Sequence, residues 1–139
     1  MKRLVVNTGP IVALLNSRDA HHAWTREVLD RVEPPLATCE AVLSEACFLV
    51  RKLDGGSAAV LELVSRGVLK VPFRLETELA AVRKLMSRYA SVPMSLADAC
   101  LVRMTELDEK ATVLTLDGDF RIYRRNGRQA VPHISPRGA

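Results

Sequence analysis

The sequence predicts an α/β fold in which a central parallel sheet carries helices on both faces. Short apolar runs of strand length alternate with longer segments whose apolar residues repeat at helical spacing. This alternation is typical of parallel sheets, because their successive strands are joined by crossover helices. No linker or internal repeat divides the 139 residues, which is the length of one domain. We therefore expect a single domain over residues 1–139, with a basic C-terminal tail over about 124–139.

The first strand and the turn that closes it organise the rest of the chain. Residues 2–6 are expected to form this strand, Asn7 or Thr8 to cap the next helix, and Pro10 to lie in its first turn. Further strands are expected at residues 36–38, 68–71 and 112–115, and the pattern allows an edge strand near 131–134. Helices are expected at residues 11–15, 20–32, 40–52, 58–65 and 75–90, and from 95 onward. Thr38 is expected to cap the helix that begins at Glu40.

The composition is that of a globular protein, with 48% hydrophobic and 26% charged residues. No apolar run approaches the ~18 residues that a membrane span needs. The opening Met-Lys-Arg is followed by too few apolar residues for a signal peptide. Cys39, Cys47 and Cys100 form no C-x-x-C pair, so we expect free thiols in the reducing environment of the cytoplasm.

Basic residues gather near the C-terminus of the sequence. No acidic residue follows Asp119, whereas five arginines do: Arg121, Arg124, Arg125, Arg128 and Arg137. A basic segment of this kind favours polyanions such as nucleic acid. An ordinary solvated C-terminus, or a surface for an acidic protein partner, explains the pattern as well.

Four acidic residues follow strands or lie on helices near the expected sheet edge, and each has a simple structural explanation. Glu45 fits the exposed side of an otherwise apolar helix. Asp98 follows Ser95 at the spacing of a capping box. Asp117 and Asp119 flank a glycine directly after a strand, as in a turn.

As a set, these residues point to a metal site. A right-handed parallel fold brings their positions, and Asn7, to the edge where the strands end and where α/β sheets bind ligands. Clustered carboxylates remain ionised together only if a cation offsets their repulsion, and Mg²⁺ or Mn²⁺ suits such ligands. These ions polarise phosphoryl oxygens and generate hydroxide from water. The Thr8 and Thr115 hydroxyls are expected to hold water or the carboxylates. The chain has no Ser-His or Cys-His pairing and no glycine-rich phosphate loop.

With these residues assembled, the sequence resembles the PIN-domain family, particularly its small single-domain ribonucleases of VapC toxin type. The resemblance covers essentially the whole chain and depends on four segments: V-V-N-T-G-P-I-V-A-L-L, A-V-L-S-E-A, M-S-L-A-D-A and T-L-D-G-D-F. It implies a three-layer α/β/α sandwich and a divalent-metal-dependent endoribonuclease that leaves a 5′-phosphate and a 3′-hydroxyl. It also implies homodimers and inhibition by an antitoxin encoded alongside.

Asn7 departs from the family pattern, which has an aspartate at this position. The asparagine carbonyl can coordinate a metal but brings no negative charge, so metal affinity and rate should both fall. Three accounts remain open. The asparagine is an introduced change that disarms a toxic enzyme, or the natural protein is a weak nuclease or an RNA-binding relic, or the other carboxylates suffice.

The expected catalytic and metal-binding residues are Asn7, Glu45, Asp98 and Asp117, with Asp119 as a more distant or water-mediated ligand. Arginines after Asp119 (Arg121, Arg124 and Arg125), together with Arg83 and Arg88 on the long helix, are candidates for contacts with RNA phosphates. The rival interpretation is a non-catalytic module of the same fold that binds RNA or an antitoxin. A signalling domain that receives phosphate on an aspartate is disfavoured, because no lysine directly follows the strand at 112–115.

Overall fold

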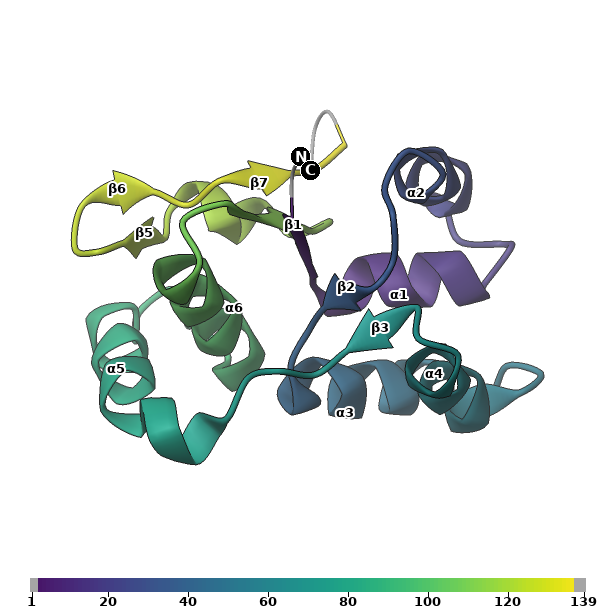
Figure 1. The fold of residues 1–139 in the computed structure, drawn as a ribbon, viewed down its shortest axis with the longest axis horizontal. Helices are drawn as coiled ribbons and strands as arrows, with labels where there is room; N and C mark the ends of the chain where they lie inside the picture. The colour runs from purple at the N-terminus through teal and green to yellow at the C-terminus, as the bar shows by residue number, and fades with distance from the viewer. Residues whose placement is uncertain (1–2, 137–139) are drawn as a thin grey trace.

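The computed structural model describes residues 3–136, and at its centre lies a five-stranded sheet whose strands all run parallel. The strand order across the sheet is β3-β2-β1-β4-β7 (Figure 1). The central strands β1 and β4 pair along their whole length, from Arg3 opposite Ala111 to Val6 opposite Leu114. The strands of this sheet are β1 (Arg3–Val6), β2 (Leu36–Ala37), β3 (Leu69–Lys70), β4 (Ala111–Leu114) and β7 (His133–Ile134).

Two groups of helices cover the two faces of the sheet. Four helices lie on one side and two on the other (Figure 1). The first group is α1 (Thr8–Leu15), α2 (His22–Leu29), α3 (Glu40–Leu49) and α4 (Gly56–Ser65), and the second is α5 (Leu75–Arg88) and α6 (Leu96–Leu107). The predicted three-layer α/β/α sandwich is therefore confirmed.

The direction of strand addition reverses between β1 and β4. From β1 the chain adds β2 and then β3 on one side, and after β3 it crosses to place β4 on the other side of β1. The connections that leave β1 and β4 therefore depart toward opposite faces of the sheet. A crevice at the carboxyl ends of the strands is expected at such a switch point, and it is the usual ligand site of open α/β sheets.

The central strands are buried on both faces, which explains why their sequences are continuous apolar runs. Residues 4–6 of β1 and all of β4 are buried, as expected for strands covered on both faces. Apolar side chains from both helical layers pack on these strands in one cluster. Among residues 3–136, no helix is both long enough and apolar enough to cross a membrane.

Several predicted boundaries are wrong by a few residues. Helix α2 occupies only residues 22–29 of the predicted 20–32, and α3 ends at Leu49, before a turn in which Gly55 has a φ of 83°. Thr38 does not cap α3. Its hydroxyl donates to the carbonyl oxygen of Val6 (2.8 Å), and Cys39 takes the N-cap position without a side-chain hydrogen bond. Thr38 therefore lies one residue before the N-cap position of α3, and its hydroxyl instead ties this segment to the end of β1.

The segment predicted as a basic tail is folded as far as the structure describes it. Strands β5 (Arg124–Arg125) and β6 (Gln129–Ala130) form an antiparallel hairpin, and β7 then adds the edge strand that the pattern allowed near residues 131–134. Asn126 and Gly127 take positive φ values of 51° and 87° in the hairpin turn. Residue 2 of the predicted first strand, and residues 137–139 of the predicted tail, lie outside the described residues.

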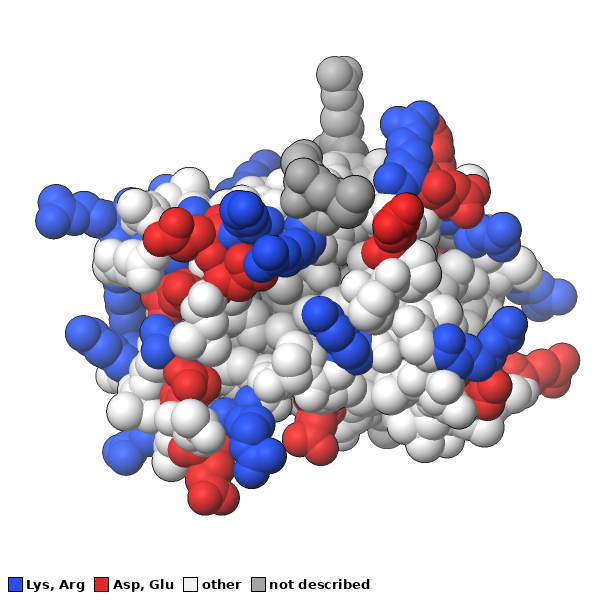
Figure 2. All heavy atoms as spheres, in the orientation of Figure 1, with Lys and Arg blue, Asp and Glu red and all other residues white. Residues whose placement is uncertain are grey.

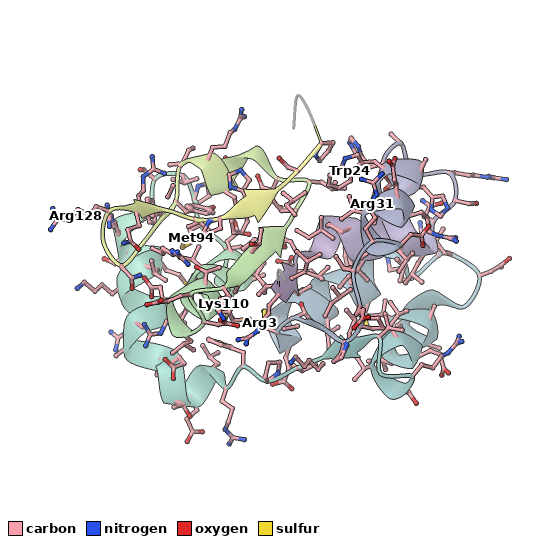
Figure 3. The ribbon with its side chains drawn as sticks, turned by 45° about the horizontal axis from the view of Figure 1, so that its top comes forward. Arg3, Trp24, Arg31, Met94, Lys110 and Arg128 are labelled. Atoms are coloured by element: carbon pink, nitrogen blue, oxygen red, sulfur yellow. The ribbon has the colours of Figure 1, made fainter. Side chains whose placement is uncertain are left out.

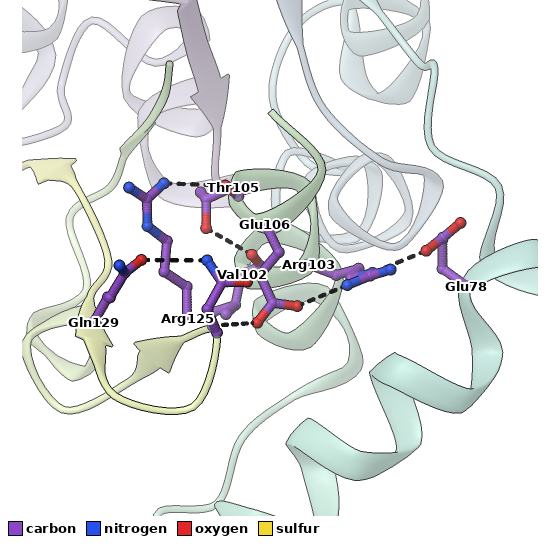
Figure 4. Close-up of polar contacts among 8 residues, drawn as sticks. Glu78, Val102, Arg103, Thr105, Glu106, Arg125 and Gln129 are labelled. Carbon is purple, nitrogen blue, oxygen red and sulfur yellow. Dashed lines mark hydrogen bonds and ion pairs between the residues drawn. The ribbon is translucent and has the colours of Figure 1, made fainter. Parts of the chain in front are cut away.

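A network of partly buried charges fastens the hairpin to α5 and α6 (Figure 4). Arg103 of α6 pairs with Glu78 of α5 at 2.8 Å and with Glu106 of its own helix at 3.1 Å. Glu106 also accepts a hydrogen bond from the backbone N–H of Asn126 at 2.7 Å. One carboxylate therefore serves two donors from different parts of the chain.

Replacing Glu106 with alanine should lower the free energy of unfolding by about 1–3 kcal/mol, because two donors lose a partly buried acceptor. Urea unfolding measures the change. Glu27→Ala is the matched control, since it removes an exposed pair with Arg31 whose side chains are 65% and 76% exposed. That control should cost no more than about 0.5 kcal/mol. Equal losses in the two variants would contradict a structural role for the Glu106 network.

Candidate functional site

A cleft of about 490 Å³ opens at the carboxyl ends of β1 and β4, at the switch point of the sheet. The predicted site residues Asn7, Glu45, Asp98, Asp117 and Asp119 all line it. They come from separate parts of the fold: the end of β1, helix α3, helix α6 and the turn after β4. The remaining lining residues are Thr8, Gly9, Leu49, Pro93, Ser95 and Leu116.

Asn7 is buried and held on both sides of its amide. Its Oδ1 accepts from the backbone N–H of Thr8 (2.7 Å), so that it caps α1, and its Nδ2 donates to Thr115 Oγ1 (3.0 Å). Thr115 also accepts from the backbone N–H of Asp117 at 2.9 Å. The Thr115 hydroxyl therefore links the ends of the two central strands.

Thr8 holds Glu45 at the edge of the cleft. The Thr8 hydroxyl donates to Glu45 Oε1 at 2.7 Å, across the gap between the first turn of α1 and helix α3. Glu45 lies on the exposed side of α3, as predicted for an acidic residue on an otherwise apolar helix. Its carboxylate nevertheless lines the cleft. Glu45 can therefore be exposed on its helix and still belong to the cleft.

Asp98 is the most enclosed of the four carboxylates, with 7% of its surface exposed. Its backbone N–H donates to Ser95 Oγ at 3.0 Å, which is half of a capping box. Its carboxylate instead accepts a hydrogen bond from the Tyr123 hydroxyl, at 2.8 Å from Oδ2. Burial raises the pKa of Asp98, and the charge of Asp117 adds to this effect, whereas the bonds from Tyr123 and Ser95 oppose it.

Asp117 and Asp119 enter the cleft from the turn that follows β4. Asp117 caps a short 3₁₀ helix, η1 (Gly118–Arg121), by accepting from the backbone N–H of Asp119 at 2.9 Å. The turn explanation is therefore correct for Asp117. Both side chains still line the cleft, so capping the turn and facing the site are not exclusive.

Gly9 lets the two walls of the cleft approach each other. A Cβ atom at this position would lie 3.1 Å from side-chain atoms of Leu116, closer than ordinary van der Waals contact. A side chain at residue 9 would therefore require Leu116 to shift by a few tenths of an ångström.

The four carboxylates have no cationic partner in the described part of the chain. The ion pairs found among residues 3–136 involve Asp108, Glu27, Glu78 and Glu106, none of which lines the cleft. The negative charges therefore face one another and the solvent. Burial is the main cause of the raised pKa of Asp98, and the charge of Asp117 adds to it.

The donor set suits a hard divalent cation that keeps part of its water shell. Within residues 3–136, no three His, Cys, Asp or Glu side chains converge closely enough to hold an ion by themselves. Mg²⁺, however, commonly takes only one or two carboxylates, together with waters and substrate phosphates. Carboxylate and amide oxygens around an open cleft fit this manner of binding.

Tyr123 is a site residue that the sequence did not reveal. It is fully buried, and its ring packs edge-on against Tyr89 and Phe120, with centroid distances of 5.2 Å in both cases. The only signal available in the sequence was a tyrosine soon after an acidic turn. A contact with Asp98, 25 residues away, has no local pattern.

Some of the arginines proposed for RNA contacts are hydrogen-bonded within the protein, whereas others are exposed. Arg124 donates to backbone carbonyls of residues 121–123, and Arg125 donates to the carbonyl of Thr105 (3.0 Å), so both stabilise the fold. Arg88 donates to the carbonyl of Gly127 at 2.6 Å. Arg121 and Arg83 are exposed.

Basic side chains do not form one continuous stripe on the face drawn in Figure 2, where acidic side chains lie among them. Arg128 extends away from the body of the protein at the hairpin (Figure 3). A second, mostly apolar hollow of about 400 Å³ is lined by residues of β1 and β2 and of the segment after β3, and Val32, Phe73 and Met104 help to line it. None of the predicted site residues lines it.

These observations define a class of protein, namely three-layer α/β/α domains with an acidic cleft at the switch point of a parallel sheet. A model of the PIN domain matches residues 4–126, and the chain belongs to the PIN domain family. The family resemblance seen in the sequence is thereby confirmed.

Two relatives from Mycobacterium tuberculosis are similar over most of the chain. Ribonuclease VapC26 of strain ATCC 25618 / H37Rv is 24% identical over 116 residues, which is 82% of this chain and 86% of the relative. The crystal structure of VapC20, described as a toxin that cleaves the sarcin–ricin loop, superposes with a TM-score of 0.69. Its identity is 24%, over 84% of this chain and 91% of VapC20, so this likeness bears on the fold.

Proposed function

We propose that this protein is a divalent-metal-dependent endoribonuclease whose active site is the acidic cleft. The observation that carries the proposal is the set of four carboxylates, without cationic partners in the described chain, at the switch point of a PIN-family fold. Membership of the family and the ribonuclease VapC26 among its relatives support RNA as the substrate.

Asp98 and Asp117 are the proposed principal metal ligands, because both line the cleft, one from α6 and one from the turn after β4. Glu45, the Asn7 carbonyl oxygen and, through water, Asp119 complete the set. A bound Mg²⁺ or Mn²⁺ would polarise a phosphoryl oxygen and lower the pKa of water. Thr8 keeps Glu45 at the edge of the cleft, and Thr115 keeps Asn7 beside Asp117.

The proposed reaction is hydrolysis of the phosphodiester bond. The water oxygen forms a new bond to phosphorus, the bond from phosphorus to the 3′ oxygen breaks, and that oxygen takes a proton. The products are a 5′-phosphate and a 3′-hydroxyl, and the 2′-hydroxyl is not consumed. Exposed Arg121, which follows Asp119 in the same turn, is the best-placed proposed contact for the RNA backbone.

The test is cleavage of a structured, 5′-labelled RNA with Mn²⁺ or Mg²⁺, and with EDTA in place of the metal. We expect cleavage only with metal, and products that end in a 3′-hydroxyl. Products that end in a 2′,3′-cyclic phosphate, or cleavage that persists in EDTA, would contradict the proposal. Such products indicate attack by the 2′-hydroxyl, which needs no metal.

Asn7 favours a second candidate function, a non-catalytic module that binds RNA or an antitoxin. Both polar groups of its amide are used inside the protein, and it supplies no charge to the cleft. This alternative predicts RNA binding without cleavage, even after Asn7 is replaced by aspartate.

We also infer that the protein acts in the cytoplasm as the toxin of a toxin–antitoxin pair, as a homodimer restrained by an antitoxin protein. The inference is supported by membership of the PIN domain family and by the resemblance to its members of VapC toxin type, among them the relative VapC26. Sedimentation of the purified chain tests the homodimer, which predicts twice the mass of 15.3 kDa.

A further inference from the structure

We propose that Tyr123 is a positioning residue that holds Asp98 in one orientation, with Oδ2 bound inside the protein and Oδ1 left for the metal. The proposal rests on the proposed function, because it assigns a role within that metal site. Its basis is the hydrogen bond from the Tyr123 hydroxyl to Asp98 Oδ2, with an oxygen-to-oxygen distance of 2.8 Å. A carboxylate bound in this way favours coordination of a metal ion through its other oxygen, Oδ1.

Tyr123 acts through Asp98 and not on the substrate. Its exposed fraction is 0%, and it is not among the residues that line the cleft. Its hydroxyl is therefore closed off from RNA and from bulk water. The only site residue to which it donates is Asp98.

The aromatic packing fixes where the Tyr123 hydroxyl lies. The Tyr123 ring meets the Phe120 ring at an interplanar angle of 82° and the Tyr89 ring at 65°, both at centroid distances of 5.2 Å. Phe120 and Tyr123 are fully buried. A ring packed on two sides cannot follow Asp98 if the carboxylate rotates, so the hydrogen bond selects one carboxylate orientation.

The same bond joins two elements that carry proposed ligands. Asp98 belongs to α6, whereas Tyr123 lies two residues after the end of η1, the short helix that Asp117 caps. Tying these elements together sets how far apart the carboxylates of Asp98 and Asp117 lie. Neighbours that orient a metal ligand typically contribute about 10–100-fold to metal affinity.

The chain provides a matched control for Tyr123. It contains two tyrosines, Tyr89 and Tyr123, and both are buried in the same aromatic cluster. The Tyr89 hydroxyl accepts from the backbone N–H of Arg124 at 2.9 Å, away from Asp98. Phenylalanine at either position removes one hydroxyl and one hydrogen bond, but only Tyr123→Phe frees the carboxylate.

The experiment is a Mn²⁺ titration followed by electron paramagnetic resonance, with the unaltered chain and its Asp98→Ala, Tyr123→Phe and Tyr89→Phe variants. Urea unfolding of each variant accompanies the titration. We expect Tyr123→Phe to weaken Mn²⁺ binding about tenfold and Tyr89→Phe to leave it unchanged, with comparable losses of stability.

The outcomes separate this inference from the proposed function. If Asp98→Ala weakens Mn²⁺ binding while the two tyrosine variants bind equally, the positioning role is wrong and the metal site stands. If the Asp98→Ala variant binds Mn²⁺ with the affinity of the unaltered chain, the proposed metal site is wrong. The proposed role of Tyr123 is then wrong as well.

Discussion

Replacing Asn7 with aspartate should raise Mn²⁺-dependent RNA cleavage roughly 100-fold. The substitution adds one negative charge beside the proposed ion, and one unit charge at 4 Å contributes about 4 kcal/mol at an effective dielectric constant of 20. Desolvation of the new carboxylate removes part of this electrostatic stabilisation. If about 2.7 kcal/mol remains in the transition state, the rate rises about 100-fold.

The structure indicates that the substitution would not disturb the fold. An aspartate can accept from the backbone N–H of Thr8 as Asn7 does. The Thr115 hydroxyl, which now accepts from Asn7 Nδ2, can turn and donate to the new carboxylate while it still accepts from the backbone N–H of Asp117. The change is therefore in charge and not in geometry.

Asn16→Asp is the matched control for this gain. Asn16 lies at the C-terminal end of the same helix, and its Oδ1 accepts from the backbone N–H of Arg18, a bond that an aspartate retains. This control adds the same charge outside the cleft and should leave the rate unchanged. Equal rates for the unaltered chain and its Asn7→Asp variant would mean that the other carboxylates suffice, and no cleavage by either would favour the binding module.

Replacing Asp98 should abolish this cleavage, with a loss of at least about 1,000-fold in the Asn7→Asp chain. Removing a principal ligand forfeits several kcal/mol of charge stabilisation, and about 4 kcal/mol corresponds to 1,000-fold. Asp98→Ala also leaves the buried Tyr123 hydroxyl without its acceptor. Asp98→Asn is therefore the sharper variant, because the amide oxygen still accepts that hydrogen bond while the charge is lost.

Rates are measured with the same labelled RNA at saturating Mn²⁺. Asp108→Asn serves as the control, since Asp108 pairs with Arg3 on the surface and does not line the cleft. That variant should cleave at the parental rate. If both Asp98 variants also cleave at that rate, Asp98 is not a ligand.

The parts of the site that the sequence predicts are those with a local signature. Asn7 and Asp117 end apolar strands, and Asp98 stands three residues after a serine cap, so each is placed by its neighbours in the chain. Parallel topology then brings these positions to one edge. The sheet, its helical layers and the composition of the cleft follow from short-range patterns of this kind.

The remaining features depend on long-range partners that have no periodic signal. The Thr38 hydroxyl donates to the carbonyl oxygen of Val6, which lies 32 residues earlier in the chain on a neighbouring strand. Arg125 reaches the Thr105 carbonyl only because the hairpin folds back on α6. Tyr123 meets Asp98 because three aromatic rings pack together, and neither spacing nor composition predicts that contact.

The switch-point topology also bears on when, during synthesis, the cleft can exist. Its residues span from Asn7 to Asp119, and its two walls follow β1 and β4, which are neighbours in the sheet but are separated in the chain by β2 and β3. A ribosome must therefore release most of the chain before the first carboxylate can meet the last. A partly synthesised chain therefore lacks the assembled cleft until the turn after β4 has been made.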